Sequence, residues 1–217
     1  MKNSILLITI IISLILVSCS DNKATNPSNN SSTTVTIGKQ IWMTKNLNVD
    51  HYRNGDSIPE VRDLRKWDTL TSGAWSYYEN SDSLGNIYGK FYNWFAVNDP
   101  RGLSPVGFHI PSVNEWDTLI IFLGGENIAA GKLKEAGTSH WNSPNKGANE
   151  SGFTSLPGGI RFGCGTYGDV GNGSFYWSST DTNAMYAWGW YLSSKYNIIG
   201  KEYYAKVYGF SVRCVKD

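Results

Sequence analysis

Residues 111–125 read PSVNEWDTLIIFLGG and carry the clearest secondary-structure signal in the chain. Ser112 and Glu115 have the spacing of a capping box, in which a hydroxyl and a carboxylate bind free amides at a helix start. Apolar residues then recur at helical spacing, at Trp116, Leu119, Ile120 and Leu123. The stretch therefore predicts a helix that begins after Ser112 and ends at Gly124-Gly125.

Toward the C-terminus, the pattern changes from helix to strand. A second short helix is predicted over residues 128–134, and residues 165–173 read as a glycine-rich surface loop. Three strands are predicted after it, over residues 175–179, 187–192 and 209–215. The last of these alternates apolar and polar residues from Phe210 to Cys214, which is typical of a half-buried strand.

Toward the N-terminus, Val35 to Met43 reads as a β-hairpin around Gly38-Lys39. Residues 46–49 and 58–61 are predicted to be short strands or extended pieces. Residues 62–86 read as a loop with a short strand near 74–78, and the dense apolar run 90–97 is predicted to be a buried helix. Helices near the middle of the chain and strands at both ends favour an α+β fold.

The composition sets limits on the function. The chain has 19 Lys and Arg residues against 18 Asp and Glu, for a formal net charge of +1. This balance gives no electrostatic footprint for nucleic acid or for an anionic membrane. With 14% aromatic residues and 23 glycines, the folded part reads as loop-rich and β-biased.

The N-terminal segment predicts export. After Lys2, the run from Ile5 to Val17 is almost purely Ile and Leu, and its length suits the core of a signal peptide better than a membrane span. Leu16-Val17-Ser18-Cys19 resembles a lipobox, which implies cleavage after residue 18 and a diacylglyceryl group on Cys19. The alternative is an uncleaved membrane anchor. In both cases we expect the bulk of the protein to lie outside the cytoplasmic membrane.

Residues 19–34 are expected to be the lipidated cysteine followed by a flexible tether. The segment from Ser20 to Thr34 is rich in Ser, Asn and Thr and holds too little apolar surface to offset the entropy of ordering. Ser20 at the second mature position, with no Asp there, resembles outer-membrane sorting in Gram-negative bacteria. The residues leave open whether the domain faces the periplasm or the exterior.

Two cysteines remain after Cys19, and they stand far apart in the sequence at Cys164 and Cys214. A disulfide persists in an oxidising compartment, so a bridge between them is slightly favoured over two unpaired thiols. The sequence leaves both alternatives open.

Motifs along the chain resemble, in order, those of one family. They are Ile37 to Leu47, Gly107 to Ser112, Glu115-Trp116, Gly124-Gly125, Ala130 to Lys134, Gly152-Phe153, Leu156 to Gly159, Arg161, Trp177 to Thr180, and Gly209 to Val215. Together they resemble the Fibrobacter succinogenes major paralogous domain, often found on bacterial surface lipoproteins. The resemblance covers residues 35–217, which gives three parts: signal peptide (1–18), lipidated Cys19 with tether (19–34), and domain (35–217).

More distantly, this family resembles the C-type-lectin-like fold shared with formylglycine-generating-enzyme domains. The resemblance implies a compact α+β domain of short helices and small antiparallel sheets, whose N- and C-terminal strands meet. No activity is established for the family. The oxidase relatives use a paired reactive thiol near the C-terminus, an arrangement that Cys164 and Cys214 do not match, so that activity is not carried over.

The residue patterns predict no catalytic residue, no bound metal and no cofactor. His51, His109 and His140 are scattered, a zinc site needs three or four ligands, and no Gly-x-Ser-x-Gly elbow is present. Glycosidases need two facing carboxylates, and no pair stands out among Asp99, Glu115, Glu126, Glu135 and Glu150. Residues 142–150 carry Asn and Glu oxygens that suit calcium, but such loops are equally typical of turns.

The positive signal is an aromatic segment near the C-terminus. Residues 175–210 hold 12 aromatic residues in 36 positions, against 14% for the whole chain. The family pattern implies core positions for Phe175, Trp177, Trp188, Leu192 and Phe210. We expect the segment to form one exposed ligand-binding face, made by Tyr186, Trp188, Trp190, Tyr191, Tyr196, Asn197, Tyr203 and Tyr204.

These features predict a non-enzymatic, lipid-anchored binding module outside the cytoplasm, on the cell surface, in the outer membrane or facing the periplasm. Its expected partners are the membrane, through the lipid, and a polysaccharide or surface protein, through the aromatic face. Two other classes stay open: a surface glycan hydrolase and a structural envelope component with no small ligand. For any single aromatic residue, simple packing in a sheet is an equal alternative.

Overall fold

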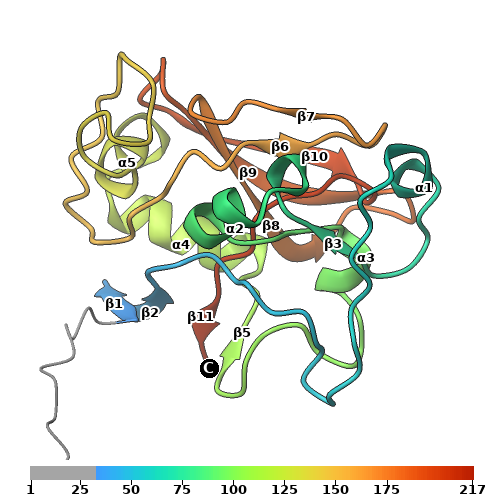
Figure 1. Ribbon diagram of the computed structural model, residues 1–217. Coiled ribbons are helices and arrows are strands. Elements are labelled where there is room, and N and C mark those ends of the chain that lie inside the picture. Colours follow the sequence, from blue (N-terminus) through green and yellow to red (C-terminus); the bar gives the residue numbers. More distant parts are fainter. Residues whose placement is uncertain (1–32) are drawn as a thin grey trace, which may run out of the picture. The chain divides into compact units, whose positions relative to one another are not determined.

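The computed structural model describes residues 33–217, which belong to one compact unit of α+β architecture (Figure 1). The predicted signal peptide, Cys19 and the tether up to residue 32 lie outside the described residues. The capping box forms as predicted: Glu115 N–H donates to Ser112 Oγ at 3.4 Å, and Ser112 N–H donates to Glu115 Oε2 at 2.8 Å. Helix α4 (Val113–Phe122) follows, and Gly124-Gly125 ends it at positive φ. Helix α5 (Glu126–Leu133) then starts within two residues of the predicted position.

The two ends of the domain meet in one sheet, as the resemblance implies. The predicted hairpin is confirmed as β1 (Thr34–Ile37) and β2 (Gln40–Met43). Strand β11 (Val215–Lys216) pairs with β2 on one side and with β5 (Phe108–His109) on the other, which gives the order β1-β2-β11-β5. The sheet therefore ties the last strand to the first hairpin.

The largest sheet has three long antiparallel strands in the order β10-β9-β8. Strands β8 (Gly173–Asp181) and β9 (Tyr186–Ser193) confirm two of the predicted strands. Strand β10 (Ile199–Ala205) was not predicted, because Lys201-Glu202 interrupts the apolar alternation. The prediction of a strand over 209–215 is wrong for most of its length: Gly209, Phe210 and Ser211 make isolated bridges only.

Short elements fill the region between the hairpin and α4. They are α1 (Leu64–Asp68), β3 (Trp75–Ser76), a 3₁₀ helix (Tyr78–Asn80), α2 (Asp82–Tyr88), β4 (Phe91–Tyr92) and α3 (Trp94–Val97), with β6 (Ile160–Arg161) and β7 (Tyr167–Gly168) later in the chain. The predicted strand near 74–78 is confirmed as β3, but the prediction of loop for the rest of residues 62–86 is wrong, because α1 and α2 form there. The predicted helix over 90–97 is wrong in its first half, because the Asn93 side chain caps the chain at Ala96 N–H and starts the helix only at Trp94.

The core has two main clusters on opposite faces of the β8–β10 sheet. Consecutive strand residues point to opposite faces, and Tyr176 accordingly belongs to one cluster and Trp177 to the other. The first cluster lies under α4 and α5 and includes the fully buried Trp116 and Trp190 (Figure 1). The second is built around Trp177 and Phe210, whose rings stack at 4.3 Å.

The side chain of Arg213 lies between the end of β2 and the segment that contains Phe153. It is 1% exposed and donates hydrogen bonds to Met43 O at 3.0 Å, Phe153 O at 2.6 Å and Asn46 Oδ1 at 2.8 Å. Burial lowers the pKa of this guanidinium. The fork geometry of arginine lets one side chain bind acceptors from two segments, residues 43–46 and 153–154, that are far apart in sequence.

The slightly favoured disulfide is not present. Cys164 is exposed and Cys214 is buried, and both are free thiols. Cys164 lies in the turn between β6 and β7, within hydrogen-bonding distance of Thr166, whereas Cys214 packs in the second core cluster, where burial raises its pKa to about 12. One thiol is at the surface and the other is in the core, which explains why the bridge does not form. Among the helices of residues 33–217, none combines the length and apolar character needed to cross a bilayer.

Candidate functional site

The sheet formed by β8, β9 and β10 borders a pocket of about 390 Å³. Its residues come from the loop after β7, from β8 and β9, and from the turn between β9 and β10. We call it the aromatic pocket, and it is lined by Asp169, Asn172, Gly173, Phe175, Tyr191, Leu192, Ser193, Ser194, Lys195 and Tyr196.

Phe175 and Tyr191 form the aromatic wall of the pocket. They lie directly opposite each other in the β8–β9 pair, so the pleat places both rings on the same face of the sheet. The ring centroids are 6.3 Å apart with an interplanar angle of 28°, which is a stacked arrangement. Phe210 supports Phe175 from the core at 5.5 Å. Both wall residues are half-buried, so the stack is fixed by packing and still open to a ligand.

The loop before β8 places polar groups at the pocket rim. Asp169 has a φ of 61°, and its carbonyl accepts bonds from the N–H groups of Asn172 at 2.9 Å and Gly173 at 2.8 Å. Asn172 Oδ1 accepts a further bond from Asn142 Nδ2 at 3.1 Å. Asp and Asn tolerate such turns better than most residues. The loop therefore holds an exposed carboxylate and an exposed amide at a fixed place.

The opposite rim is the turn between β9 and β10, and a buried lysine holds it. Lys134 Nζ donates to Ser193 O at 2.9 Å and to Tyr196 O at 3.4 Å, and its side chain is fully buried. Burial, together with the positive charge of Lys146, lowers the Lys134 pKa to about 8. Ser194 N–H donates to Asn172 O at 2.8 Å, which joins the two rims.

The chemistry of the lining suits a ligand that is both apolar and rich in hydroxyl groups. The stacked rings offer flat apolar contact. Around them stand an acceptor, Asp169, a cation, Lys195, and the phenol of Tyr196, which is 65% exposed as a residue. A few polar groups around an apolar wall are typical of small-ligand sites.

The structure brings only part of the predicted binding set to this pocket. Tyr191 and Tyr196 line it. Asn197 lies in the same turn but packs against Gly131 of α5. Tyr204 is on the Tyr191 face, where it packs edge-on against Phe210 at 4.8 Å, and burial and the neighbouring charge of Glu202 raise its pKa. These last two residues are therefore part of the packing.

The prediction of a single binding face is wrong, because neighbouring strand residues point to opposite sides of a sheet. Trp190 is fully buried and its ring lies 6.0 Å from that of Trp116, so it is a core residue. Tyr186, Trp188 and Tyr203 share the Trp190 side of the sheet. The ring of Tyr203 lies 5.7 Å from that of Tyr186 and 6.1 Å from that of Trp188.

The sequence did not identify Asp169, Asn172, Phe175 and Lys195 as site residues. Phe175 was assigned to the core, and the loop residues carried only a turn signal. The register of the β8–β9 hairpin would have placed Phe175 beside Tyr191, but the hairpin loop, residues 182–185, gives no clear turn type in the sequence.

Each of the three histidines contacts a carboxylate: His51 contacts Asp50, His109 contacts Glu115 and His140 contacts Glu135. His109 lies between two carboxylates, with Nε2 2.6 Å from Glu115 Oε1 and Nδ1 2.8 Å from Asp217 Oδ1. Asp169 is the one acid among the described residues that line the aromatic pocket. Within residues 33–217, no group of three or more His, Cys, Asp or Glu side chains is placed to hold a metal ion.

Comparison with known families agrees with the motifs along the chain. The model of the Fibrobacter succinogenes major domain matches residues 35–216. No curated protein and no solved structure matches the chain. Because the family model covers most of the chain, this chain belongs to the Fibrobacter succinogenes major domain family.

Proposed function

We propose that this protein is a lipid-anchored module outside the cytoplasm that binds a polysaccharide in the aromatic pocket, without catalysis. The observation that carries the proposal is the stacked pair of Phe175 and Tyr191 beside Asp169, Asn172 and Lys195. The C–H face of a sugar ring packs on an aromatic face, while its hydroxyl groups bond to carboxylate, amide and ammonium groups. The short helices and small antiparallel sheets are compatible with a C-type-lectin-like fold.

The location outside the cytoplasm is part of the proposal, and it rests on the sequence. The apolar run from Ile5 to Val17 and the lipobox-like Leu16-Val17-Ser18-Cys19 support export and lipid attachment at Cys19. Mass spectrometry of the protein from a Gram-negative host tests this part. We expect loss of residues 1–18 and a lipid on Cys19. A chain that retains residues 1–18, or has an unmodified Cys19, would contradict it.

A polysaccharide screen on soluble residues 20–217 tests the binding part. Tyr191→Ala is the informative variant, because it removes half of the stacked pair. Tyr203→Ala is the matched control, since this tyrosine is 58% exposed on the other face of the same sheet. We expect saturable binding that Tyr191→Ala weakens at least tenfold, or about 1.4 kcal/mol, and that Tyr203→Ala leaves unchanged.

The same screen separates the other function classes. Equal loss in both variants would mean that the pocket is not the site. Binding to an envelope protein but to no polysaccharide would replace the sugar with a protein ligand. Turnover of a glycan that is abolished by Asp169→Asn would overturn the non-catalytic assignment.

A further inference from the structure

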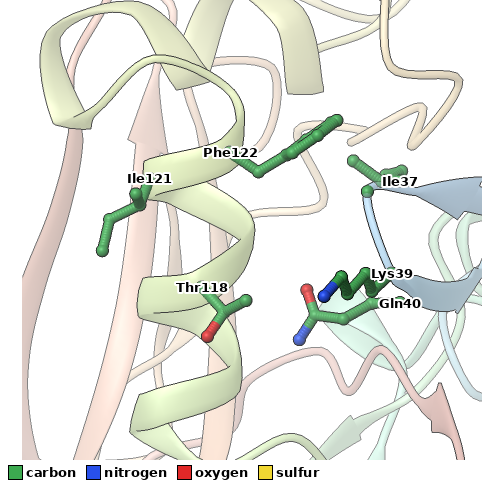
Figure 2. Close-up of a pocket in the computed structure, with 7 residues that line it drawn as sticks. Ile37, Lys39, Gln40, Thr118, Ile121 and Phe122 are labelled. Atoms are coloured by element: carbon green, nitrogen blue, oxygen red, sulfur yellow. The ribbon is translucent and has the colours of Figure 1, made fainter.

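A second hollow lies between the first hairpin and α4, and its lining is mostly apolar (Figure 2). It has a volume of about 660 Å³ and is bordered by Ile37 to Gln40 on the hairpin and by Thr118, Ile121 and Phe122 on the helix. Gln40 Nε2 donates to Glu115 O at 2.9 Å, which fixes the hairpin against the start of α4. The hollow is therefore a built feature between two fixed elements.

Large apolar side chains stand exposed beside this hollow. Ile121 is 75% exposed and Phe122 is 62% exposed at the end of α4, and Ile128 is 48% exposed in the first turns of α5. Phe122 lies against the hairpin turn, because a Cβ on Gly38 would stand 3.0 Å from its ring. We call Ile121, Phe122 and Ile128 the apolar rim. Ile121 and Phe122 line the hollow, and Ile128 packs over Gly124, two residues after Phe122. Exposed apolar side chains of this size indicate an interaction site.

The position of the apolar rim in the chain indicates what covers it. Strand β1 is the first element of the described residues, and its start at Thr34 is only four residue steps from Gly38, roughly 13 Å of strand. Fifteen residues, 20–34, lead from Cys19 to the start of β1, and they span at most about 54 Å when fully extended. The lipid proposed on Cys19 therefore keeps the apolar rim within reach of the bilayer surface.

The charges around the apolar rim are balanced. Lys39 lines the hollow, and a smaller neighbouring hollow, also bordered by Phe122, is lined by Lys132 and Glu150. Glu126 stands two residues before Ile128 in the chain. This balance fits a zwitterionic surface and gives no preference for an anionic one. Insertion of the three apolar side chains would attract the domain to the bilayer, as the apolar face of an interfacial helix does.

We propose that the apolar rim docks the domain onto the phospholipid surface that holds its own lipid anchor; this inference rests on the proposed lipidation of Cys19. Transfer of an Ile or Phe side chain out of water is favourable, and partial insertion contributes less than complete burial. Three such contacts bind a free domain weakly. Attachment by the anchor makes the docking intramolecular, with a high effective concentration of membrane.

Docking through the apolar rim leaves the aromatic pocket free. Ile128 stands near the start of α5, whereas Lys134, directly after its end, holds the turn that forms one rim of the pocket. Ile128 and Lys134 are six positions apart, which is about 9 Å of helical rise. The geometry thus gives the domain one surface for the membrane and a separate one for the ligand.

The test uses the mature, lipidated chain in phosphatidylcholine vesicles, with Cys164→Ser to remove the exposed thiol. Ile121→Cys carries an environment-sensitive nitrobenzoxadiazole label, and Ala184→Cys in the exposed β8–β9 loop is the matched control. We expect the label at 121, and not at 184, to brighten on vesicles and to be quenched by spin-labelled lipid. Phe122→Ser with Ile128→Ser should abolish the difference. Added phosphatidylglycerol should not change it.

Several outcomes would overturn the inference. One is equal quenching at both labels or quenching at neither. Another is a brightening of the label at 121 that occurs without lipid and rises with protein concentration, which would assign the apolar rim to a second copy. Mass analysis of the same sample reports the lipid on Cys19, and polysaccharide binding by soluble residues 20–217 reports the pocket. Failure of the docking is therefore distinguishable from failure of either part of the proposed function.

Discussion

Tyr191 lies against Gly200, its cross-strand partner in β10, so closely that a Cβ on the glycine would stand 2.2 Å from the tyrosine ring. The absence of a side chain at position 200 gives the ring its place on the sheet. From there it stacks on Phe175 in the neighbouring strand. An aromatic ring that covers a strand glycine is a known stabilising arrangement. Here it also fixes the wall of the aromatic pocket.

Gly200→Ala should displace the Tyr191 ring and weaken polysaccharide binding about tenfold, or about 1.4 kcal/mol. The fold should persist, since the substitution adds one methyl group at a flexible ring. Calorimetric titration and thermal unfolding measure the two effects. In the Tyr191→Ala background, Gly200→Ala should cause no further loss. Additive losses would show that Gly200 acts independently of the tyrosine.

Trp190→Ala should unfold or strongly destabilise the domain, by about 3–5 kcal/mol, because it empties a fully buried position beside Trp116. Tyr191→Ala, one residue further along, should cost much less stability and reduce binding instead. Urea unfolding of both variants makes the comparison. Similar stability losses for the two neighbours would contradict the assignment of their faces.

Lys134→Met should lower the free energy of unfolding by about 1–3 kcal/mol, since it leaves the carbonyls of Ser193 and Tyr196 without their donor. Lys132→Met, a half-exposed position two residues earlier in α5, is the control and should have little effect. Urea unfolding at neutral pH measures both.

The same lysine predicts a dependence on pH. Its pKa is about 8 in the folded state and 10.5 in the reference state, so the unfolded chain binds more protons between these values. Burial of the charge therefore opposes folding below pH 8, and this cost is relieved as the pH rises toward 10.5. The stability of the wild type should rise relative to Lys134→Met over this window. Parallel curves would contradict the shifted pKa.

His109 should stabilise the domain at low pH. Burial lowers its pKa, but hydrogen bonds with Glu115 and Asp217 outweigh burial and raise it above the ordinary value. A raised folded pKa gives stability that is present below the unfolded value and is lost as the pH rises through the folded value. His109→Gln should therefore cost more at about pH 5.5 than at about pH 8.5, by less than about 1 kcal/mol because the side chain is partly exposed. An equal cost at both values would contradict this.

Arg213→Lys should destabilise the domain by about 2–4 kcal/mol, although the charge is kept. A lysine has no planar fork and leaves several of the acceptors on Met43, Asn46 and Phe153 unpaired in the core. Arg101→Lys, whose side chain is 39% exposed, is the control and should cost far less. Comparable losses would show that the buried fork does not hold the terminal sheet.

Local chemistry explains which parts of the fold could be predicted from the sequence. The capping box of Ser112 and Glu115 and the Gly38-Lys39 turn are specified by neighbouring residues, and both formed as predicted. Strand β10 depends on pairing with β9, and its Lys201-Glu202 pair hides the alternation. Asn93, which follows β4 and caps α3, also accepts a bond from Ala74 N–H, 19 residues away, that no local pattern indicates.

The site was predictable only in part, for a related reason. Aromatic enrichment drew attention to residues 175–210, and Tyr191 and Tyr196 do line the pocket. Which of two adjacent aromatics faces the core depends on the register and on what packs on each face of the sheet. The tertiary packing of α4 and α5 buries Trp190 and leaves Tyr191 accessible. The loop with Asp169 and Asn172 carries only a turn signal in the sequence, and the tertiary fold places it at the pocket.

The central claim is that the face of Tyr191 and Phe175 binds sugar. An NMR titration of soluble residues 20–217 with oligosaccharides from the polysaccharides of the screen tests it most directly. The account predicts saturable shifts of the Phe175 and Tyr191 ring signals and of the Lys195 amide, with the Tyr203 ring unchanged. Shifts centred on Tyr186, Trp188 and Tyr203, or no shifts with any oligosaccharide, would contradict it.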